Sequence, residues 1–420
     1  MSSHERTVLV GGVLADGTRA DIAIDATTGI ISGVGDIEHR PGDEAVDCTG
    51  MVVLASAVDA HAHLDKVLSA RDRAAMPATL NEAVQDWMER WPNITTADFV
   101  ERATEAVELM AARGTTAIRT HVDVGTGVGL RSVEALVQVR DDVAARGIAD
   151  LQVVALAAPP LGGAAGAPHR RLLESAVDAG IDIIGGSPDI DPDLPGATIA
   201  AFDVAERARL PLDLHCDQST DPHLFGLRDI IRLTNERDVV AVVASHCVSL
   251  ASQPESVQHE TAESMAAAGI GVTTMPLTSL FYFGWDQPVG PPRGLTAIRV
   301  LKEHGVVVAA GADNVRDVFF PLGRFDPFET ASVLAMASHC SPAEAWAMCT
   351  VDARRVMGLP PVSVEVGSRA DLVAIRGQNL NEAVAAASEH RTVLRAGRVI
   401  ARTLVNGGIE NGGLENGGVE

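Results

Sequence analysis

The chain has 420 residues, of which 46% are hydrophobic and 21% are charged, and its formal net charge is -23. A chain of this length buries a large core and is expected to fold as two or three domains. A negative field of this size repels phosphate backbones and anionic lipids. The composition therefore argues against nucleic acid and membrane surfaces as partners, and it favours a neutral or cationic small molecule.

The five cysteines form no C-x-x-C pair and are odd in number, which is typical of reduced thiols rather than of a disulfide framework. The first ten residues, MSSHERTVLV, lack the basic start and the long apolar core of a signal peptide. No apolar run is long enough to span a bilayer. We therefore expect a cytoplasmic protein.

The first 54 residues contain short apolar runs separated by turns rich in Gly and Asp, a pattern that predicts strands and hairpins. The same pattern returns over residues 359–405, and we expect the two segments to join in a small composite β-sandwich domain. Residues 406–420 repeat the pattern NGGIE NGGLE NGGVE. A segment this short, acidic and rich in glycine does not build a core, so we expect it to be disordered.

Residues 55–358 differ, because short apolar runs alternate there with longer stretches of helical periodicity. One such stretch, residues 96–114, ends on a glycine, as helices commonly do. Eight β-plus-α units in about 300 residues indicate a (β/α)8 TIM-like barrel. A doubly wound open sheet is the alternative, but no glycine-rich phosphate loop follows any of the runs. The first predicted strand ends at His61, and the others cover residues 115–124, 150–158, 180–186, 210–217, 238–247, 269–277 and 305–314.

Five histidines and one aspartate lie at the ends of these runs. In a (β/α)8 barrel the chemistry takes place at the C-terminal ends of the strands, so we expect these side chains to share one mouth. Each alone is equally well explained as a capped strand end or a core histidine. Together they indicate a metal site, because imidazole and carboxylate ligands suit zinc or ferrous iron. The six residues are His61, His63, His121, His215, His246 and Asp313.

Four segments, VDAHAHLDK, LHCD, ASHC and GADNVRDVFFPLG, resemble in order and spacing those of the amidohydrolase superfamily. The resemblance is greatest to its cytosine deaminase and N-isopropylammelide amidohydrolase branch. It implies a (β/α)8 barrel with a composite β-domain, and one catalytic metal. Carried over by position, the metal ligands are His61, His63, His215 and Asp313, and His246 is the catalytic histidine.

Many members of this superfamily hold two metals that are bridged by a carbamylated lysine at the end of the fourth strand. The chain has only two lysines, Lys66 and Lys302, and neither lies near the fourth run. We therefore expect one divalent ion, most simply zinc, with iron or manganese as alternatives. Such an ion lowers the pKa of water, Asp313 would act as base as well as ligand, and His246 would stabilise the oxyanion. The predicted reaction is hydrolysis of a C–N bond at a trigonal carbon.

The positions that would contact the substrate depart from the cytosine deaminase pattern. The glutamate of the H-C-D-E motif is replaced by Gln218, and an amide does not transfer protons at neutral pH. A substrate-reading glutamine falls by the same resemblance at Ala158, and a histidine near Asp189. We expect deamination, or release of an amine, from a nitrogen heterocycle or related cyclic amide or amidine that is not cytosine.

Three further side chains complete the expected pocket, each with an alternative structural role. Lys66 follows the second ligand and is otherwise a solvated loop lysine, and His121 lies at the mouth together with Asp123. Trp285 belongs to the aromatic segment TSLFYFGW, which is otherwise an apolar plug. The predicted substrate-binding residues are Gln218, Lys66, His121, Asp189 and Trp285.

A catalytically inactive scaffold with the same fold is the alternative function. Such proteins usually lose metal ligands, whereas all four candidate ligands remain here. The sequence does not distinguish a monomer from a homo-oligomer.

Overall fold

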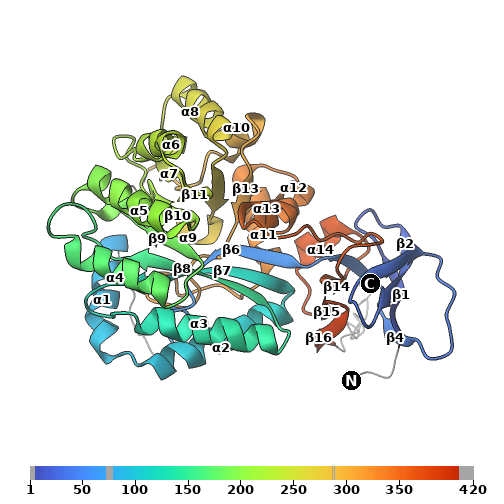
Figure 1. The fold of residues 1–420 in the computed structure, drawn as a ribbon. Helices are drawn as coiled ribbons and strands as arrows, with labels where there is room; N and C mark the ends of the chain where they lie inside the picture. The colour runs from blue at the N-terminus through green and yellow to red at the C-terminus, as the bar shows by residue number, and fades with distance from the viewer. Residues whose placement is uncertain (1–4, 72–78, 286, 288, 406–420) are drawn as a thin grey trace, which may run out of the picture.

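The computed structural model describes residues 5–71, 79–285, 287 and 289–405. These residues form two sheets of eight strands each (Figure 1). One sheet is the barrel, and the other lies beside it and is built from both ends of the chain. The predicted tail, residues 406–420, lies outside the described residues. No helix in the described ranges is long and apolar enough to cross a membrane.

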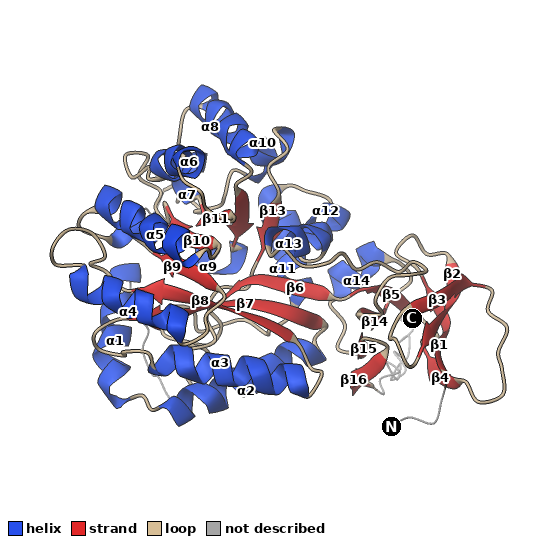
Figure 2. Ribbon diagram, in the orientation of Figure 1, coloured by secondary structure: helices blue, strands red, loops and turns tan. Residues whose placement is uncertain are grey.

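The barrel sheet follows chain order, and each strand runs parallel to the next. Its strands are buried almost throughout because helices cover the outside, which explains the continuous apolar runs in the sequence (Figure 2). The barrel fold predicted from these runs is confirmed. The strands are β6 (Ala57–Ala62), β7 (Thr115–Val124), β8 (Asp150–Ala157), β9 (Ile183–Gly186), β10 (Leu212–Cys216), β11 (Val242–His246), β12 (Gly271–Thr274) and β13 (Val308–Ala310).

The first and last strands meet and close the barrel, which rules out the open doubly wound sheet. The backbone N–H of Asp313 donates to the carbonyl of His61 at 2.8 Å. Asp59 on β6 accepts the N–H of Ala312 at 3.1 Å. Gly311, directly before these bonds, has no room for a side chain, since a Cβ there would lie 2.6 Å from the His61 carbonyl oxygen. The seam therefore places two candidate metal ligands, His61 and Asp313, side by side from the two ends of the barrel sequence.

The longest helix shows how the local sequence sets the helix bounds. α2 (Thr96–Ala112) begins with a capping box between Thr95 and Asp98. It buries a stripe that includes Phe99, Ala103 and Val107 against the barrel. It ends two residues before the predicted limit at Gly114, whose φ of +105° is one that glycine tolerates best.

The other helices connect the strands or cover the ends of the barrel. They are α1 (Leu80–Arg90), η1 (Trp91–Asn93), α3 (Arg131–Ala145), α4 (Ala167–Asp178), η2 (Pro188–Ile190), α5 (Leu194–Ala208), α6 (Leu227–Glu236), α7 (Val248–Ala251), α8 (Glu255–Ala268), α9 (Pro276–Tyr282), α10 (Ile298–Glu303), α11 (Pro327–Ser338), α12 (Pro342–Met348), α13 (Val351–Val356) and α14 (Leu380–Ala386).

The second sheet is mixed, and its three C-terminal strands join the five N-terminal strands in one continuous hydrogen-bonded sheet. Its central joint is the antiparallel pairing of β5 with β14, where Leu54 lies opposite Val373. This confirms the predicted composite β-domain. Its strands are β1 (Arg6–Val13), β2 (Arg19–Asp25), β3 (Ile31–Gly35), β4 (Glu44–Asp47), β5 (Met51–Ala55), β14 (Leu372–Arg376), β15 (Arg391–Arg395) and β16 (Arg398–Thr403).

The closing seam gives a first testable prediction. Gly311→Ala places a Cβ against the backbone and Cβ of His61, so the seam must widen. We expect a loss of about 1–3 kcal/mol in the free energy of unfolding of the metal-free protein, measured by urea denaturation. Gly186→Ala is the matched control, because its added Cβ would meet its nearest neighbour at an ordinary 3.7 Å. Equal losses in the two variants would contradict the role given to the seam.

Candidate metal centre

Three imidazole rings and one carboxylate converge at the mouth of the barrel. His61 and His63 come from β6 and the residue after it, His215 from β10, and Asp313 from beyond β13. The Nε2 atoms of His63 and His215 lie 3.2 Å apart. Asp313 Oδ1 lies 3.2 Å from His63 Nε2 and 3.8 Å from His61 Nε2. The structure thus brings together all four ligands expected from the sequence.

The chemistry of these atoms fits a divalent cation. The Nε2 atom of His61 is buried and has no hydrogen-bond partner in the described chain, and two imidazole nitrogens face each other between His63 and His215. Burial, and then the neighbouring histidines, hold the pKa of His61 well below its usual range, while burial and then Lys66 lower that of His63 to about 3. Neutral imidazoles have the lone pairs that a metal requires. A cation would bind buried atoms that have no other hydrogen-bond donor available to them in the described residues.

A chain of hydrogen bonds fixes the orientation and tautomer of His61. Ser245 Oγ donates its single proton to Asp213 Oδ1 at 2.8 Å, so it accepts from His61 Nδ1 at 3.0 Å. The proton of His61 is thereby held on Nδ1, and the Nε2 lone pair is free. Arg119 donates to the other oxygen of Asp213 at 2.8 Å and neutralises it. The roles of Ser245, Asp213 and Arg119 were not predicted from the sequence. Asp213 and Arg119 are charged residues inside predicted strands, which was a signal that could have identified them.

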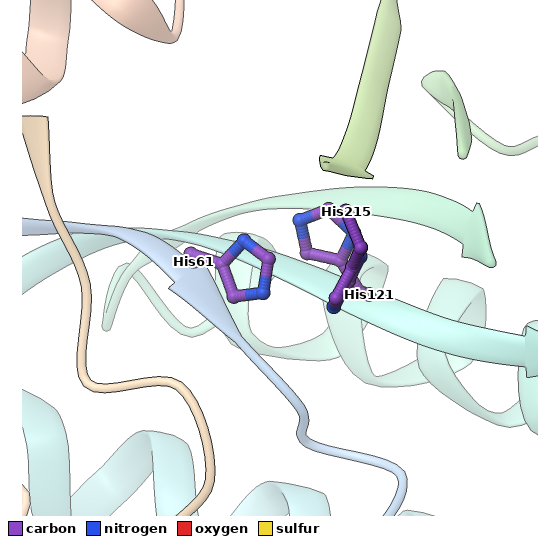
Figure 3. A group of neighbouring side chains, drawn as sticks. All are labelled: His61, His121 and His215. Carbon is purple, nitrogen blue, oxygen red and sulfur yellow. The ribbon is translucent and has the colours of Figure 1, made fainter. Parts of the chain in front are cut away.

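His121 lies within the ligand cluster rather than on the pocket wall. Its ring stacks on that of His61, with centroids 3.9 Å apart, and lies 4.9 Å from the ring of His215 (Figure 3). The three histidines also form a group at metal-binding distance. Both ring nitrogens of His121 are buried without a hydrogen-bond partner in the described chain, and Nε2 lies 3.8 Å from Asp213 Oδ1. The ring of His121 is not among the residues that line the pocket, and its expected contact with the substrate stays a prediction.

His246 and Asp313 are held in uncommon backbone conformations at their strand ends. Their φ angles are 72° and 61°, in the left-handed region that costs a non-glycine residue about 1–3 kcal/mol. Both ring nitrogens of His246 are buried and unpartnered in the described chain, and burial lowers its pKa to about 3. Asp313 Oδ2 accepts a bond from Thr278 Oγ1 at 2.5 Å. Strain of this kind is retained where it aims a functional side chain.

A pocket opens above the cluster, with His63, His215 and Asp313 at its floor. One wall is apolar and comes from α1 and η1, and further apolar residues come from the end of β8. Lys66, Asp189, Gln218 and Ala158 line it, whereas the expected Trp285 does not. The lining residues are His63, Lys66, Leu80, Val84, Trp87, Met88, Trp91, Asp123, Leu156, Ala157, Ala158, Pro159, Ser187, Asp189, Ile190, His215, Gln218, Asp313, Asn314 and Phe319.

Lys66 is a buried ammonium at the side of the pocket. Its Nζ lies 2.8 Å from Asp123 Oδ2 and 3.0 Å from Asp65 Oδ2. Burial opposes its charge, but the two carboxylates outweigh burial and raise the pKa of Lys66. Trp87 on α1 donates to the same oxygen of Asp123 at 2.7 Å. This hydrogen bond connects helix α1 to the ion pair of Lys66 with Asp123.

Two aspartates near Gln218 have different environments. Asp217 has a φ of 52° and accepts the N–H groups of Gly226 and Leu227 at 2.6 and 3.1 Å. Both of its carboxylate oxygens are therefore bonded to the backbone at the start of α6. Asp189 Oδ2 accepts the backbone N–H of Gln218 at 2.8 Å, and its Oδ1 is buried without a partner in the described chain. Of the two, only Asp189 lines the pocket.

Trp285 lies on the surface, with 70% of the residue exposed. Its indole N–H donates to the carbonyl of Phe281. Phe281 packs edge-on against Phe320, with centroids 5.4 Å apart. The aromatic segment is therefore partly packed beside the mouth, and a contact of Trp285 with substrate stays a prediction.

Residues 104–408 of the chain match the amidohydrolase family. A pterin deaminase of Rhizobium rhizogenes is 29% identical over 394 residues, which cover 92% of this chain and 89% of the relative. N-isopropylammelide isopropyl amidohydrolase of Pseudomonas sp. (strain ADP) is 25% identical over 382 residues, or 87% of this chain and 90% of the relative.

A crystal structure of 5-methylcytosine deaminase from Klebsiella pneumoniae superposes with a TM-score of 0.85 at 25% identity, over 95% of this chain and 98% of that one. The family match covers more than half of the chain, and it includes the strands that supply His215 and Asp313. The chain therefore belongs to the amidohydrolase family and is a hydrolase of carbon–nitrogen bonds other than peptide bonds.

Proposed function

We propose that the protein uses one divalent ion to hydrolyse an exocyclic C–N bond of a nitrogen heterocycle, with release of ammonia or an amine. The observation that carries the proposal is the convergence of four candidate ligand side chains, three of which line the floor of a pocket with an apolar wall. The relatives named above act on a pterin, an N-alkylated triazine and a methylated pyrimidine, which all present such a bond. An inactive scaffold would not need to keep this ligand set.

The residues present would hold the ion through His61, His63, His215 and Asp313. Three imidazoles and one carboxylate suit zinc best, with iron or manganese as alternatives. No lysine lies at the end of β9 to bridge a second ion, which supports a mononuclear site. When bound, the ion supplies Lewis acidity, which lowers the pKa of water and stabilises negative charge.

The chain's own groups would move the protons. Asp313 lies at the floor of the pocket, where its carboxylate takes a proton from the attacking water and returns it to the leaving nitrogen. His246 has two unpartnered nitrogens beside the ligand cluster, and its N–H hydrogen-bonds the oxygen on which charge develops. Lys66 donates to an oxo group of the ring from the side of the pocket.

Cytosine itself is disfavoured as a substrate. Gln218 and Ala158 both line the pocket, and they replace the glutamate and glutamine that read the pyrimidine in the cytosine deaminase pattern. The apolar side chains of α1, including Leu80 and Met88, would instead accommodate a larger ring or an N-alkyl substituent. Assaying aminated and N-alkylated pyrimidines, triazines and pterins for ammonia and amine release tests the proposal. No turnover on any of them would contradict it.

The metal content can be measured directly. We expect elemental analysis of the purified protein to find one equivalent of zinc, iron or manganese per chain. His61→Ala and His215→Ala each remove a ligand and should leave the protein largely metal-free, whereas His259→Ala, on α8, should retain the ion. Two equivalents per chain would exclude a mononuclear site, and none would favour the scaffold.

His246→Ala separates binding of the ion from turnover. Because His246 is not a proposed ligand, the variant should keep its metal. It should lose the group that stabilises the developing charge, so kcat should fall by about 10²-fold or more. Undiminished kcat would remove His246 from the mechanism.

Gln218 is expected to position the substrate without transferring a proton. Gln218→Ala should cost roughly one hydrogen bond, about 1–1.5 kcal/mol, and mainly raise KM. Gln218→Glu adds a titratable group and should alter the pH–rate profile. A thousandfold fall in kcat at unchanged KM in Gln218→Ala would show that the amide acts in the transition state.

A further inference from the structure

One carboxylate oxygen in the pocket has no hydrogen-bond partner within the described chain. Asp189 lies in η2, directly after β9, and its side chain lines the pocket. Its Oδ2 is held by the Gln218 N–H at 2.8 Å, but its Oδ1 is shielded from solvent and unpaired. A buried acceptor without a partner costs free energy unless a ligand completes it. This wall of the pocket therefore presents an acceptor that a hydrogen-bond donor on a bound ligand could satisfy.

The other carboxylates near the pocket each hold a structural contact. Asp123 accepts from Lys66 and Trp87 through one oxygen, Oδ2, so that the ammonium neutralises its charge, and Asp217 accepts two backbone N–H groups. Asp313 is bonded to Thr278 and lies among the metal ligands. Asp189 is thus the carboxylate best placed to meet the substrate.

The hydrogen bond to Gln218 holds Asp189 beside the position where the deaminase pattern has its acidic residue. In the deaminase pattern an acidic side chain stands at the position of Gln218, where this chain has an amide that transfers no proton. The backbone of that same residue holds Asp189, so a carboxyl group is supplied beside it from the end of β9 instead of β10. Burial, and then the charge of Asp217, raise the pKa of Asp189 to about 7, which is suitable for an acid–base group at neutral pH.

We propose that Asp189 is a catalytic residue that hydrogen-bonds a ring nitrogen next to the reacting carbon and exchanges a proton with it. The inference rests on the proposed function. It restricts the substrate to heterocycles with an amidine-type N=C–N edge, and it excludes rings whose corresponding nitrogen is alkylated. Lys66, on the side of the same pocket, would bind an oxo group of the same ring.

The proton balance is as follows. As water oxygen adds to the ring carbon, Asp313 takes one water proton and the carboxyl of Asp189 gives its proton to the ring nitrogen, so the C=N bond becomes a C–N–H bond. Asp313 then gives its proton to the exocyclic nitrogen, and that C–N bond breaks. The remaining hydroxyl proton returns to Asp189 as the C=O bond forms. The product is a ring lactam plus ammonia or an amine, and both carboxyl groups are restored.

The test uses Asp189→Asn, Asp189→Ala and the control Asp191→Asn. Asparagine keeps the size and a hydrogen-bonding oxygen but carries no transferable proton. Asp191 lies on the same loop, accepts the backbone N–H groups of Leu161 and Asp193, and does not line the pocket. Metal content and thermal unfolding of each variant show whether it is folded and loaded.

Binding is measured first, by calorimetry on the metal-loaded chain, with pterin, N-isopropylammelide and 5-methylcytosine and with their ring-N-methylated derivatives. We expect the wild type to bind at least one parent ring about tenfold more tightly than its methylated form. Asp189→Ala should lose this discrimination, and Asp191→Asn should keep it. Discrimination that survives in Asp189→Ala, or a wild type that binds none of the rings, would overturn the assignment.

Turnover of the best substrate is measured second. Asp189→Asn should lower kcat by about 10²-fold or more with little change in KM, while Asp191→Asn should match the wild type. An unchanged kcat in Asp189→Asn would overturn the acid–base role. A wild type that binds with discrimination yet hydrolyses no ring would contradict the proposed function while leaving the substrate contact of Asp189 established by binding.

Discussion

The structure depends on keeping neutral imidazoles and a carboxylate together in a buried space at the floor of the pocket. Desolvation penalises every charged form there, so the histidines remain unprotonated, and a bound cation would satisfy nitrogens that have no hydrogen-bond partner in the described chain. The surrounding features serve this cluster. Ser245 and Asp213 fix the tautomer of His61, and the left-handed backbone at His246 and Asp313 points their side chains toward the centre. A metal here would stabilise the fold as well as the reaction.

Much of this could be predicted from the sequence, because periodicity and strand ends determine it. Apolar runs bounded by polar residues located the eight barrel strands, and the last few residues of three runs include His61, His215 and Asp313. The neighbours of a side chain inside the barrel could not be predicted in this way. The bounds of β7 match the predicted run 115–124, yet the sequence pattern does not show that His121, three residues before the end of the strand, stacks on His61.

The walls of the pocket were harder to predict than its floor, because they come from connections rather than strands. Helix α1 lies between the first two barrel strands and supplies an apolar wall, yet its sequence reads only as an amphipathic helix. Its position is set by the Trp87–Asp123 bond, a contact between residues 36 apart in the chain. The Asp189–Gln218 bond likewise joins two loops whose proximity only the closed barrel creates. The walls of the pocket therefore depend on the connections, whereas its floor depends on the strand ends.

The seam between β6 and β13 has a consequence for how the protein folds. Asp59 and Ala312, which bond across it, are 253 residues apart. Joining the ends of a loop this long costs on the order of 5 kcal/mol of chain entropy. A ligand held at a thousand times its Kd returns about 4 kcal/mol, nearly the same amount. The ion would act as a removable cross-link, because it would hold together residues from the two ends of the barrel sequence.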